Sequence, residues 1–527
     1  MNSRTLLIGI DGATFRLILP YVKDGSLKNI GRLMADGCWG DLTSTIPPIT
    51  SPAWPALMTG KLPGKLGVFG FHEFKPQYIL DNFINSTHIP SKMFWEIAGD
   101  CGKKVFIVNF PFTYPIRKAS GGIISGFLTP ENATDFYYPP SLSSDVKDYS
   151  LAYPEDLKEA GGLQGFMARM EEGLSKRCAV MERMAAKDKY DLFMFCFQEF
   201  DLSSHFMWKY IDPGFSEYNT DDGAAARAYM KRIHVKFDET IGKILELQIP
   251  DNVMIASDHG SGPVGKYFFN INRLFIEHGI LKSNRRSIHR MIFRNLPKSL
   301  RKGFEERWKD KIALVDFSRT SAWCSSYRTK IVNIMINLKG KYPGGIISPG
   351  KEYEELLDKI TGLLMNVRHN GKQVVREVWR KEELYNGDYL DIAPDLTLRI
   401  DDDYEVPHNM GDSVRWPLFG PDPMRERRSG GHEQQGIFII SGKGIKKGGK
   451  VKEEGIQSIA PTALFLLGLP VPKDMDGRVM EQAMEEGILE SWPVRYSEPS
   501  RYEGNNPSAG YEDEKLVEEQ LRALGYI

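Results

Sequence analysis

The sequence predicts an α/β protein with a mostly parallel central sheet, helices on both faces of that sheet, and an inserted α+β cap subdomain. Short, almost continuously apolar runs recur along the chain, as is typical of parallel strands buried on both faces. Longer segments with helical periodicity lie between them, and this alternation is typical of a sheet covered on both sides. The length of 527 residues, with 41% hydrophobic and 26% charged, allows two to four domains or one large domain with insertions.

Six apolar runs are the candidate strands of the core. They are TLLIGI (5–10), KVFIVNF (104–110), DLFMFCF (191–197), NVMIA (252–256), DLTLRI (395–400) and GIFII (436–440). Helical patterns span 163–187 and 224–247 between them. We therefore expect the strands to be buried and parallel, with these helices packed against the sheet.

The middle of the chain has a different character. Residues 281–311 are rich in Lys and Arg, and a strand pattern (330–340) and a helix pattern (351–367) follow. Such charge could attract an anionic ligand, although a solvated amphipathic helix is its commoner explanation. We expect a first segment of the catalytic core at 1–282, a basic α/β insertion or cap at 283–390, a second segment of the core at 391–480, and a tail at 481–527 that ends in a helix.

Charge and cysteine content exclude several classes of protein. The formal net charge is −1, so the overall charge gives no reason to expect a nucleic-acid partner. Five dispersed cysteines without a CxxC pair argue against a disulfide framework and against a cysteine zinc site. The first apolar run is too short for a signal sequence, and no later run approaches a membrane span. We expect a cytoplasmic protein without an integral membrane segment; its oligomeric state stays open.

Carboxylates and imidazoles follow the ends of several predicted strands. Asp11 follows 5–10, Asp201 and His205 follow 191–197, Asp258 and His259 follow 252–256, and His432 precedes 436–440. Ligands of open α/β sheets bind at the carboxyl ends of the strands, so these side chains are expected at one edge. Taken singly, each has an ordinary explanation, such as a helix cap, a turn residue or a core histidine. Taken together, their position at strand ends and in glycine-rich loops favours a shared site.

The spacing of these residues suits a metal site. Asp201 and His205 share one face if their segment is helical. Gly430 and Gly431 would let the chain turn sharply before the last strand. Three aspartates and three histidines form a mixed oxygen and nitrogen set, which suits zinc first and manganese second. Their number is about what two divalent ions need.

The stretch PPITSPAWPALMTG (47–60) carries Thr50 and Ser51 just before Pro52. A hydroxyl residue in this position is most often a helix N-cap, and by itself the stretch favours that role. The alternative is that Thr50 is a nucleophile. A threonine hydroxyl needs a base or a metal ion to lower its pKa, and the predicted metal site would supply one. A helix N-terminus would also present backbone N–H groups to an anionic substrate.

These motifs together resemble the alkaline phosphatase superfamily, and within it the type I phosphodiesterase/nucleotide pyrophosphatase branch. The motifs that carry the resemblance are IDG, TSPAWPALMTGKLPGKLGVFGF, DLSSH, SDHG, GGHEQQGIFI and IAPTALFLLGLPVPKDMDGR. They occur in the family's order and span about 1–275 and 391–480. The resemblance implies an alkaline-phosphatase-like fold and a phosphoric ester hydrolase that acts on a small-molecule phosphoester.

The resemblance also implies a role for each site residue. Asp11, Thr50, Asp258 and His259 match the residues around the first metal ion, and Thr50 matches the nucleophile. Asp201, His205 and His432 match the ligands of the second ion. The family reaction forms a phospho-threonine intermediate that water then hydrolyses. Many nucleotide pyrophosphatases carry an Asn-His pair where this chain has Ala53 and Trp54, so the resemblance leaves nucleotide selectivity open.

Other reactions on the same scaffold stay open at this stage. A diester leaves one charge on the phosphate, which suits two metal ions and few arginines near Thr50. Monoester hydrolysis, phosphonate cleavage and phosphotransfer are the alternatives. Sulfatases of the superfamily use a modified Cys or Ser, and position 50 is a threonine. A non-catalytic binding protein is disfavoured because no predicted ligand or nucleophile is missing.

Overall fold

The computed structural model describes residues 3–72, 83–154, 157–283, 315–325, 329–407 and 415–502. Its described residues form two compact units, one within 3–72, 83–263 and 426–502 and the other within 264–425. Most of the predicted basic segment and the predicted C-terminal helix lie outside the described residues. The segment boundaries at 283, 390 and 480 stay a prediction.

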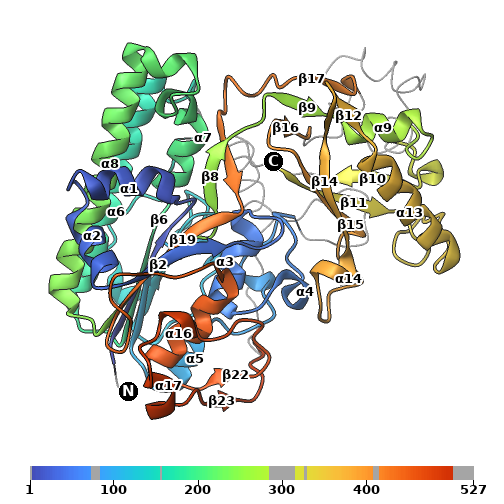
Figure 1. Cartoon of the computed structure of the whole chain (residues 1–527). Coiled ribbons are helices and arrows are strands. Elements are labelled where there is room, and N and C mark those ends of the chain that lie inside the picture. Colours follow the sequence, from blue (N-terminus) through green and yellow to red (C-terminus); the bar gives the residue numbers. More distant parts are fainter. Residues whose placement is uncertain are drawn as a thin grey trace. The chain divides into compact units, whose positions relative to one another are not determined.

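A ten-stranded sheet forms the centre of the first unit (Figure 1). Its strand order is β20-β2-β19-β7-β1-β6-β3-β4-β5, and β21 also pairs with β2. The bounds are β1 Thr5–Ile10, β2 Gly37–Thr43, β3 Val105–Val108, β4 Gly122–Ile124, β5 Tyr137–Tyr138, β6 Leu192–Phe197, β7 Asn252–Ala256, β19 Gln435–Gly442, β20 Gly449–Lys450 and β21 Glu454–Gly455. Strands β1, β6 and β7 are buried along their whole length, as their continuous apolar runs predict.

Most neighbouring strands of this sheet are parallel. Strand β1 pairs in parallel with both β6 and β7, and β3 pairs in parallel with β6 and β4. The predicted parallel direction of the last apolar run is wrong, because β19 runs antiparallel to both β7 and β2. A strand buried on both faces is apolar in either direction, so its composition does not reveal which way it runs.

Helices cover both faces of the sheet, as predicted. Figure 1 shows α1, α2, α6 and α8 on one side and α3, α5 and α16 on the other. Their bounds are α1 Phe15–Lys23, α2 Lys28–Ala35, α3 Thr50–Thr59, α5 Phe94–Asp100, α6 Leu163–Lys187, α7 Glu199–Ile211, α8 Asp221–Gln248 and α16 Ile459–Leu466. Helices α6 and α8 coincide closely with the two helical patterns found in the sequence.

The second unit contains smaller sheets. A four-stranded antiparallel sheet has the order β10-β11-β15-β14, with bounds Ala322–Ser325, Ile331–Ile336, Leu396–Ile400 and Val375–Arg380. Helix α13 (Lys351–Met365) packs against β14. A three-stranded sheet joins β16 (Tyr404–Glu405), β9 (Tyr267–Phe269) and β17 (Phe419–Pro421). The run over 395–400 is therefore not a parallel strand of the central sheet, because β15 pairs antiparallel with β11 and β14.

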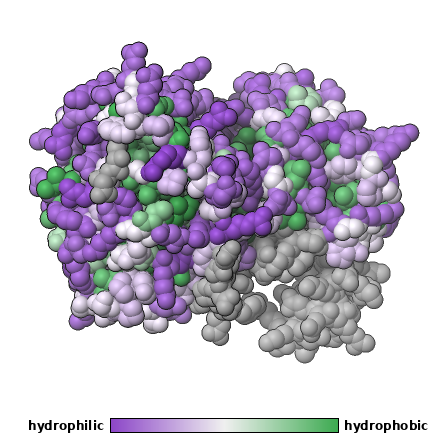
Figure 2. All heavy atoms as spheres, turned by 90° about the horizontal axis from the view of Figure 1, so that it is seen from below, coloured by the Kyte–Doolittle hydropathy of each residue, from purple (hydrophilic) through white to green (hydrophobic). Residues whose placement is uncertain are grey.

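The core of the described residues is made mainly of buried apolar side chains. Hydrophilic residues make up most of the coloured surface on the face that Figure 2 shows. All five cysteines are free thiols. Among the helices of the described ranges, none combines the length and the apolar character that crossing a bilayer requires.

Candidate active site

All seven residues singled out from the sequence lie in the first unit, near the carboxyl ends of its parallel strands. Asp11 follows β1, and Thr50 is the first residue of α3. Asp201 and His205 lie in α7, which follows β6. Asp258 and His259 follow β7, and His432 lies in β18 (Gly430–Glu433), which pairs with β8 (Gly260–Pro263). All seven side chains are buried, with exposed fractions of 0–6%.

A first group forms around His259. Its Nε2 lies 3.7 Å from Asp11 Oδ1, 3.3 Å from Asp258 Oδ2 and 3.4 Å from Thr50 Oγ1. The other ring nitrogen, Nδ1, lies 3.0 Å from the carbonyl oxygen of Gly260. Because a carbonyl can only accept, Nδ1 carries the proton in this contact, and Nε2 is left with a lone pair facing the group.

A second group forms around Asp201. Its Oδ2 lies 3.1 Å from His205 Nε2, four residues along α7, and its Oδ1 lies 3.6 Å from His432 Nε2. The two histidine Nε2 atoms are 3.0 Å apart. His205 Nδ1 lies 3.0 Å from the carbonyl oxygen of Gly430, which favours the same tautomer as in His259. The helical spacing that the sequence suggested for Asp201 and His205 is thus present.

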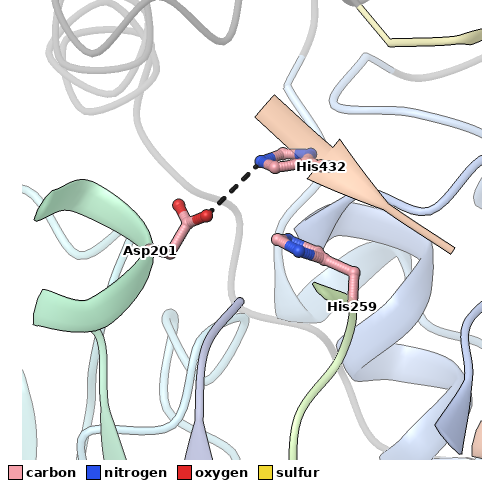
Figure 3. A group of neighbouring side chains, drawn as sticks. All are labelled: Asp201, His259 and His432. Carbon is pink, nitrogen blue, oxygen red and sulfur yellow. Dashed lines mark ion pairs between the residues drawn. The ribbon is translucent and has the colours of Figure 1, made fainter. Parts of the chain in front are cut away.

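The two groups adjoin through their histidines. The rings of His259 and His432 stack with centroids 3.9 Å apart. Figure 3 shows Asp201, His259 and His432 pointing toward one another from a helix, a loop and a strand. Two trios offer ligand atoms that all lie within 4.8 Å of one another, namely Asp11, Asp258 and His259, and Asp201, His259 and His432. His259 belongs to both trios, so the two candidate metal positions are neighbours.

Gly12 allows the loop after β1 to approach the helix that carries Asp201. Its φ of +68° is in the left-handed region that glycine adopts without strain. A Cβ atom there would lie 2.8 Å from Asp201 Oδ1. The N–H of Gly12 donates to Asp258 Oδ1 over 3.1 Å. The absence of a side chain at Gly12 therefore allows Asp11, Asp201 and Asp258 to lie close together.

Three buried carboxylates lie close together in the site and raise the cost of ionising one another. Burial raises the pKa of Asp11 well above its ordinary range, and repulsion from Asp258 and Asp201 adds to this. Burial raises the pKa of Asp258 in the same way. Burial would also raise the pKa of Asp201, but attraction to His205 and His432 outweighs it and lowers that pKa. Ionising all three aspartates is thus costly unless positive charge is added.

Burial favours the neutral form of the two histidines beside Asp201, whereas the Asp201 carboxylate favours their charged form. Burial lowers the pKa of His432 well below its ordinary value, and repulsion from His259 adds to the effect. Burial also lowers the pKa of His205, with a further contribution from Arg428. Neutral imidazole is the form that binds a metal ion.

Thr50 is not a helix cap. The residue at the N-cap of α3 is Ile49, and it makes no side-chain cap bond. Thr50 opens the helix and turns its hydroxyl to His259, whereas Ser51 Oγ donates to the carbonyl oxygen of Gly70 over 2.5 Å. The interpretation of Thr50 as a cap, which the local stretch favoured, is therefore wrong. Its hydroxyl instead contacts His259, in the loop after β7.

The loop before β19 also differs from its prediction. Gly430 does not make a sharp turn, because it begins strand β18. A Cβ atom at Gly430 would lie 2.1 Å from the carbonyl oxygen of Ser204 in α7. This glycine is therefore needed for close packing, which brings His432 against His205.

Two contacts of the site were not predicted from the sequence, those of Trp54 and Arg428. Trp54 Nε1 donates to Asp11 Oδ2 over 2.8 Å. The Arg428 guanidinium lies against His205, with Nη2 2.7 Å from Nε2. Trp54 stands four residues after Thr50, and this spacing was a usable signal for a shared helix face. Arg428 stands four residues before His432 within a basic run, which gave no such signal.

Comparison with known proteins identifies the family. The sequence profile described as type I phosphodiesterase / nucleotide pyrophosphatase matches residues 5–432. No curated protein sequence matches the chain.

Solved structures share its fold. Phosphonoacetate hydrolase from Sinorhizobium meliloti 1021, in complex with phosphonoformate, has a TM-score of 0.54 and 13% identity, with 88% of this chain and 96% of that chain covered. The same enzyme with phosphonoacetate has a TM-score of 0.54 and 12% identity over the same coverage. Murine ectonucleotide pyrophosphatase / phosphodiesterase 5 has a TM-score of 0.49 and 12% identity, with 92% and 100% covered. The likeness to the hydrolase shows the fold of the chain.

Proposed function

We propose, from the membership of this chain in the type I phosphodiesterase / nucleotide pyrophosphatase family, that it hydrolyses small-molecule phosphoric esters at Thr50 with two divalent metal ions. Membership makes the chain a phosphohydrolase of the alkaline phosphatase superfamily. The nucleophile, the ions and the ester class are our proposal. The observation that carries it is the convergence of three buried aspartates, three histidines and one threonine hydroxyl.

The buried oxygens of the site fit divalent cations. Within the described part of the chain, Asp11 Oδ1 and Asp258 Oδ2 are buried and have no hydrogen-bond partner. A buried carboxylate oxygen without a partner is costly, and a metal ion would satisfy it. Both oxygens face the lone pair of His259 Nε2. Carboxylate oxygens combined with imidazole suit zinc first and manganese second.

Each group of residues would hold one ion. Asp11, Asp258 and His259, with Thr50 beside them, would hold the first. We assign Asp201, His205 and His432 to the second, where the trio of mutually close ligand atoms contains His259 in place of His205. Ions bound there would supply Lewis acidity, lowering the pKa of a coordinated hydroxyl and withdrawing charge from a phosphoryl oxygen. The carbonyl groups of Gly260 and Gly430 orient the histidines for this role by accepting from Nδ1.

The position of Thr50 at the start of α3 supports its proposed role as the nucleophile. Thr50 begins α3, so the backbone N–H groups of Thr50 and Ser51 have no acceptor within the helix and can face a phosphate. In the first step the bond from Oγ1 to phosphorus forms and the ester bond to the leaving alkoxide breaks, and the proton lost by the Thr50 hydroxyl is balanced by protonation of the alkoxide to the alcohol. In the second step water attacks the phospho-threonine, the Oγ1–phosphorus bond breaks, and Thr50 regains its proton.

The test combines activity, metal content and trapping of the intermediate. We expect Thr50→Ala to lower turnover at least about a thousandfold, because the variant lacks the nucleophilic hydroxyl. Its metal content should stay near that of the wild type, because the aspartates and histidines remain. Thr59→Ala is the matched control, since Thr59 ends the same helix and donates to Pro55. Rapid quenching with acid should yield a phosphorylated peptide that contains Thr50.

The ester class is decided by a parallel rate comparison. The substrates are an aryl diester, an aryl monoester, a nucleoside triphosphate, phosphonoacetate and an aryl sulfate. We expect the diester to be fastest, although Arg428 adds a positive charge beside His205 that a monoester could use. Unchanged turnover in Thr50→Ala, or full activity after complete removal of metal, would refute the proposal.

A further inference from the structure

Trp54 makes a direct link between the helix that carries Thr50 and the carboxylate of Asp11. Its indole Nε1 donates to Asp11 Oδ2 over 2.8 Å, and both side chains have an exposed fraction of 0%. Thr50 and Trp54 are four residues apart in α3, so they lie on one face of that helix. A hydrogen bond to a buried charged group is among the stronger ones in proteins.

The indole ring is held in place by its surroundings. A Cβ atom at Gly9, in β1, would lie 2.8 Å from the Trp54 ring and 2.8 Å from Cys196 Sγ, so this position leaves room for the ring only as glycine. Phe110 contacts the indole edge-to-face, with ring centroids 5.3 Å apart. The N–H of Trp54 therefore has a fixed direction, and it points at one oxygen of Asp11.

Because of this hydrogen bond, the two carboxylate oxygens of Asp11 have different surroundings. Oδ2 is engaged by Trp54. Oδ1 lies 3.7 Å from His259 Nε2 and has no hydrogen-bond partner in the described ranges. Asp11 thus offers a single oxygen to the first group. Without the indole N–H, the carboxylate could rotate and present either oxygen, or both, to a cation.

We propose that Trp54 is a positioning residue. Its N–H holds the Asp11 carboxylate so that only Oδ1 is available to bind a metal ion. Because Trp54 and Thr50 belong to the same helix, it also keeps Asp11 and Thr50 in a constant position relative to each other. The inference rests on the proposed function, because it assigns Asp11 to a divalent ion. It adds a structural role for a residue in which this chain departs from the Asn-His pair that many nucleotide pyrophosphatases carry. A ring that only fills the core would need the aromatic surface and not the N–H.

The test separates the N–H from the ring. Demetallated wild type, Trp54→Phe and Trp95→Phe are titrated with Zn²⁺ by calorimetry, and their unfolding is followed in parallel. Trp95 is the matched control, because it is 1% exposed and its Nε1 has no hydrogen-bond partner among the residues the structure describes. Both variants lose the same indole ring atoms from the core, but only Trp54→Phe loses a hydrogen bond to a ligand.

We expect Trp54→Phe to weaken the binding of one of two Zn²⁺ ions about 10–100-fold, as is typical when a group that orients a ligand is removed. The other ion should bind as in the wild type, and Trp95→Phe should leave both affinities unchanged. At saturating Zn²⁺, kcat of Trp54→Phe should fall while KM changes little, since Thr50 is then misplaced. Equal Zn²⁺ affinities in the wild type and Trp54→Phe would overturn the inference.

A second variant covers the case in which Trp54→Phe does not fold. The isostere 3-benzothienylalanine at position 54 keeps the size of the ring and replaces the N–H by sulfur. It should show the same selective loss of Zn²⁺ affinity, and wild-type affinity would overturn the inference. A wild type that binds no divalent ion would instead refute the metal site of the proposed function, so the two failures are distinguishable.

Discussion

The pH dependence of the free energy of unfolding tests quantitatively whether His234 is buried in the packing of α8. His234, in α8, is 2% exposed and lies among aromatic rings, 5.0 Å from Phe200 and 5.1 Å from Tyr21 between centroids. Its Nδ1 donates to the carbonyl oxygen of Met230. Burial lowers the pKa of His234 from 6.5 to about 4. The folded protein therefore keeps this imidazole neutral in mild acid.

The sign and size of the effect follow from this shift. Above pH 6.5 the imidazole is neutral in both states and has no effect on stability. As the pH falls below 6.5, the unfolded chain binds a proton that the folded chain does not, so the free energy of unfolding decreases. The decrease reaches about 2 kcal/mol at pH 5 and saturates below pH 4 at about 3.4 kcal/mol, from 1.36 kcal/mol for each unit of pKa shift.

The assay compares His234→Leu with the wild type by urea unfolding between pH 7.5 and pH 4. Leucine fills a similar volume and does not titrate, so the variant should lose about 2 kcal/mol less than the wild type between pH 7.5 and pH 5. The lost hydrogen bond to Met230 lowers stability equally at all pH values and cancels from this difference. His278→Leu, at an exposed position, is the control. Parallel pH profiles of the wild type and His234→Leu would refute the reasoning.

Two further predictions concern the supports of the site. Gly12→Ala should lower both turnover and metal content, because its Cβ would lie 2.8 Å from Asp201 Oδ1. Gly25→Ala is the control: its φ of +77° is similar, but no atom lies within 4 Å of the added Cβ, so it should change neither quantity. Equal effects of the two substitutions would contradict the role of the contact with Asp201. Arg177→Met should lower the free energy of unfolding by about 3–5 kcal/mol, because it leaves the buried Glu199 carboxylate without its charged partner. The two side chains are 2.7 Å apart and both 1% exposed, so the double variant Arg177→Met/Glu199→Leu should recover much of the loss, and additive losses would refute the pairing.

The class of the fold, and the proximity of the three aspartates, could be predicted from the amino-acid sequence alone. Continuous apolar runs predict buried strands wherever they occur, since burial on both faces requires apolar side chains on both faces. Parallel strands share one carboxyl edge, so the residues after β1, β6 and β7 had to meet there. Asp11, Asp201 and Asp258 were predictable for this reason.

The tertiary structure decided what depends on contacts between distant segments. The direction of β19 and the placement of β15 in another sheet follow from pairing partners that apolar composition does not encode. Whether Thr50 caps its helix or faces a histidine depends on a loop that is about 200 residues away in the sequence. The bond from Trp54 to Asp11 depends on space left by Gly9 in β1. A local sequence pattern indicates which face of a segment is buried. The packing of segments that are distant in the sequence determines which atoms come into contact on that face.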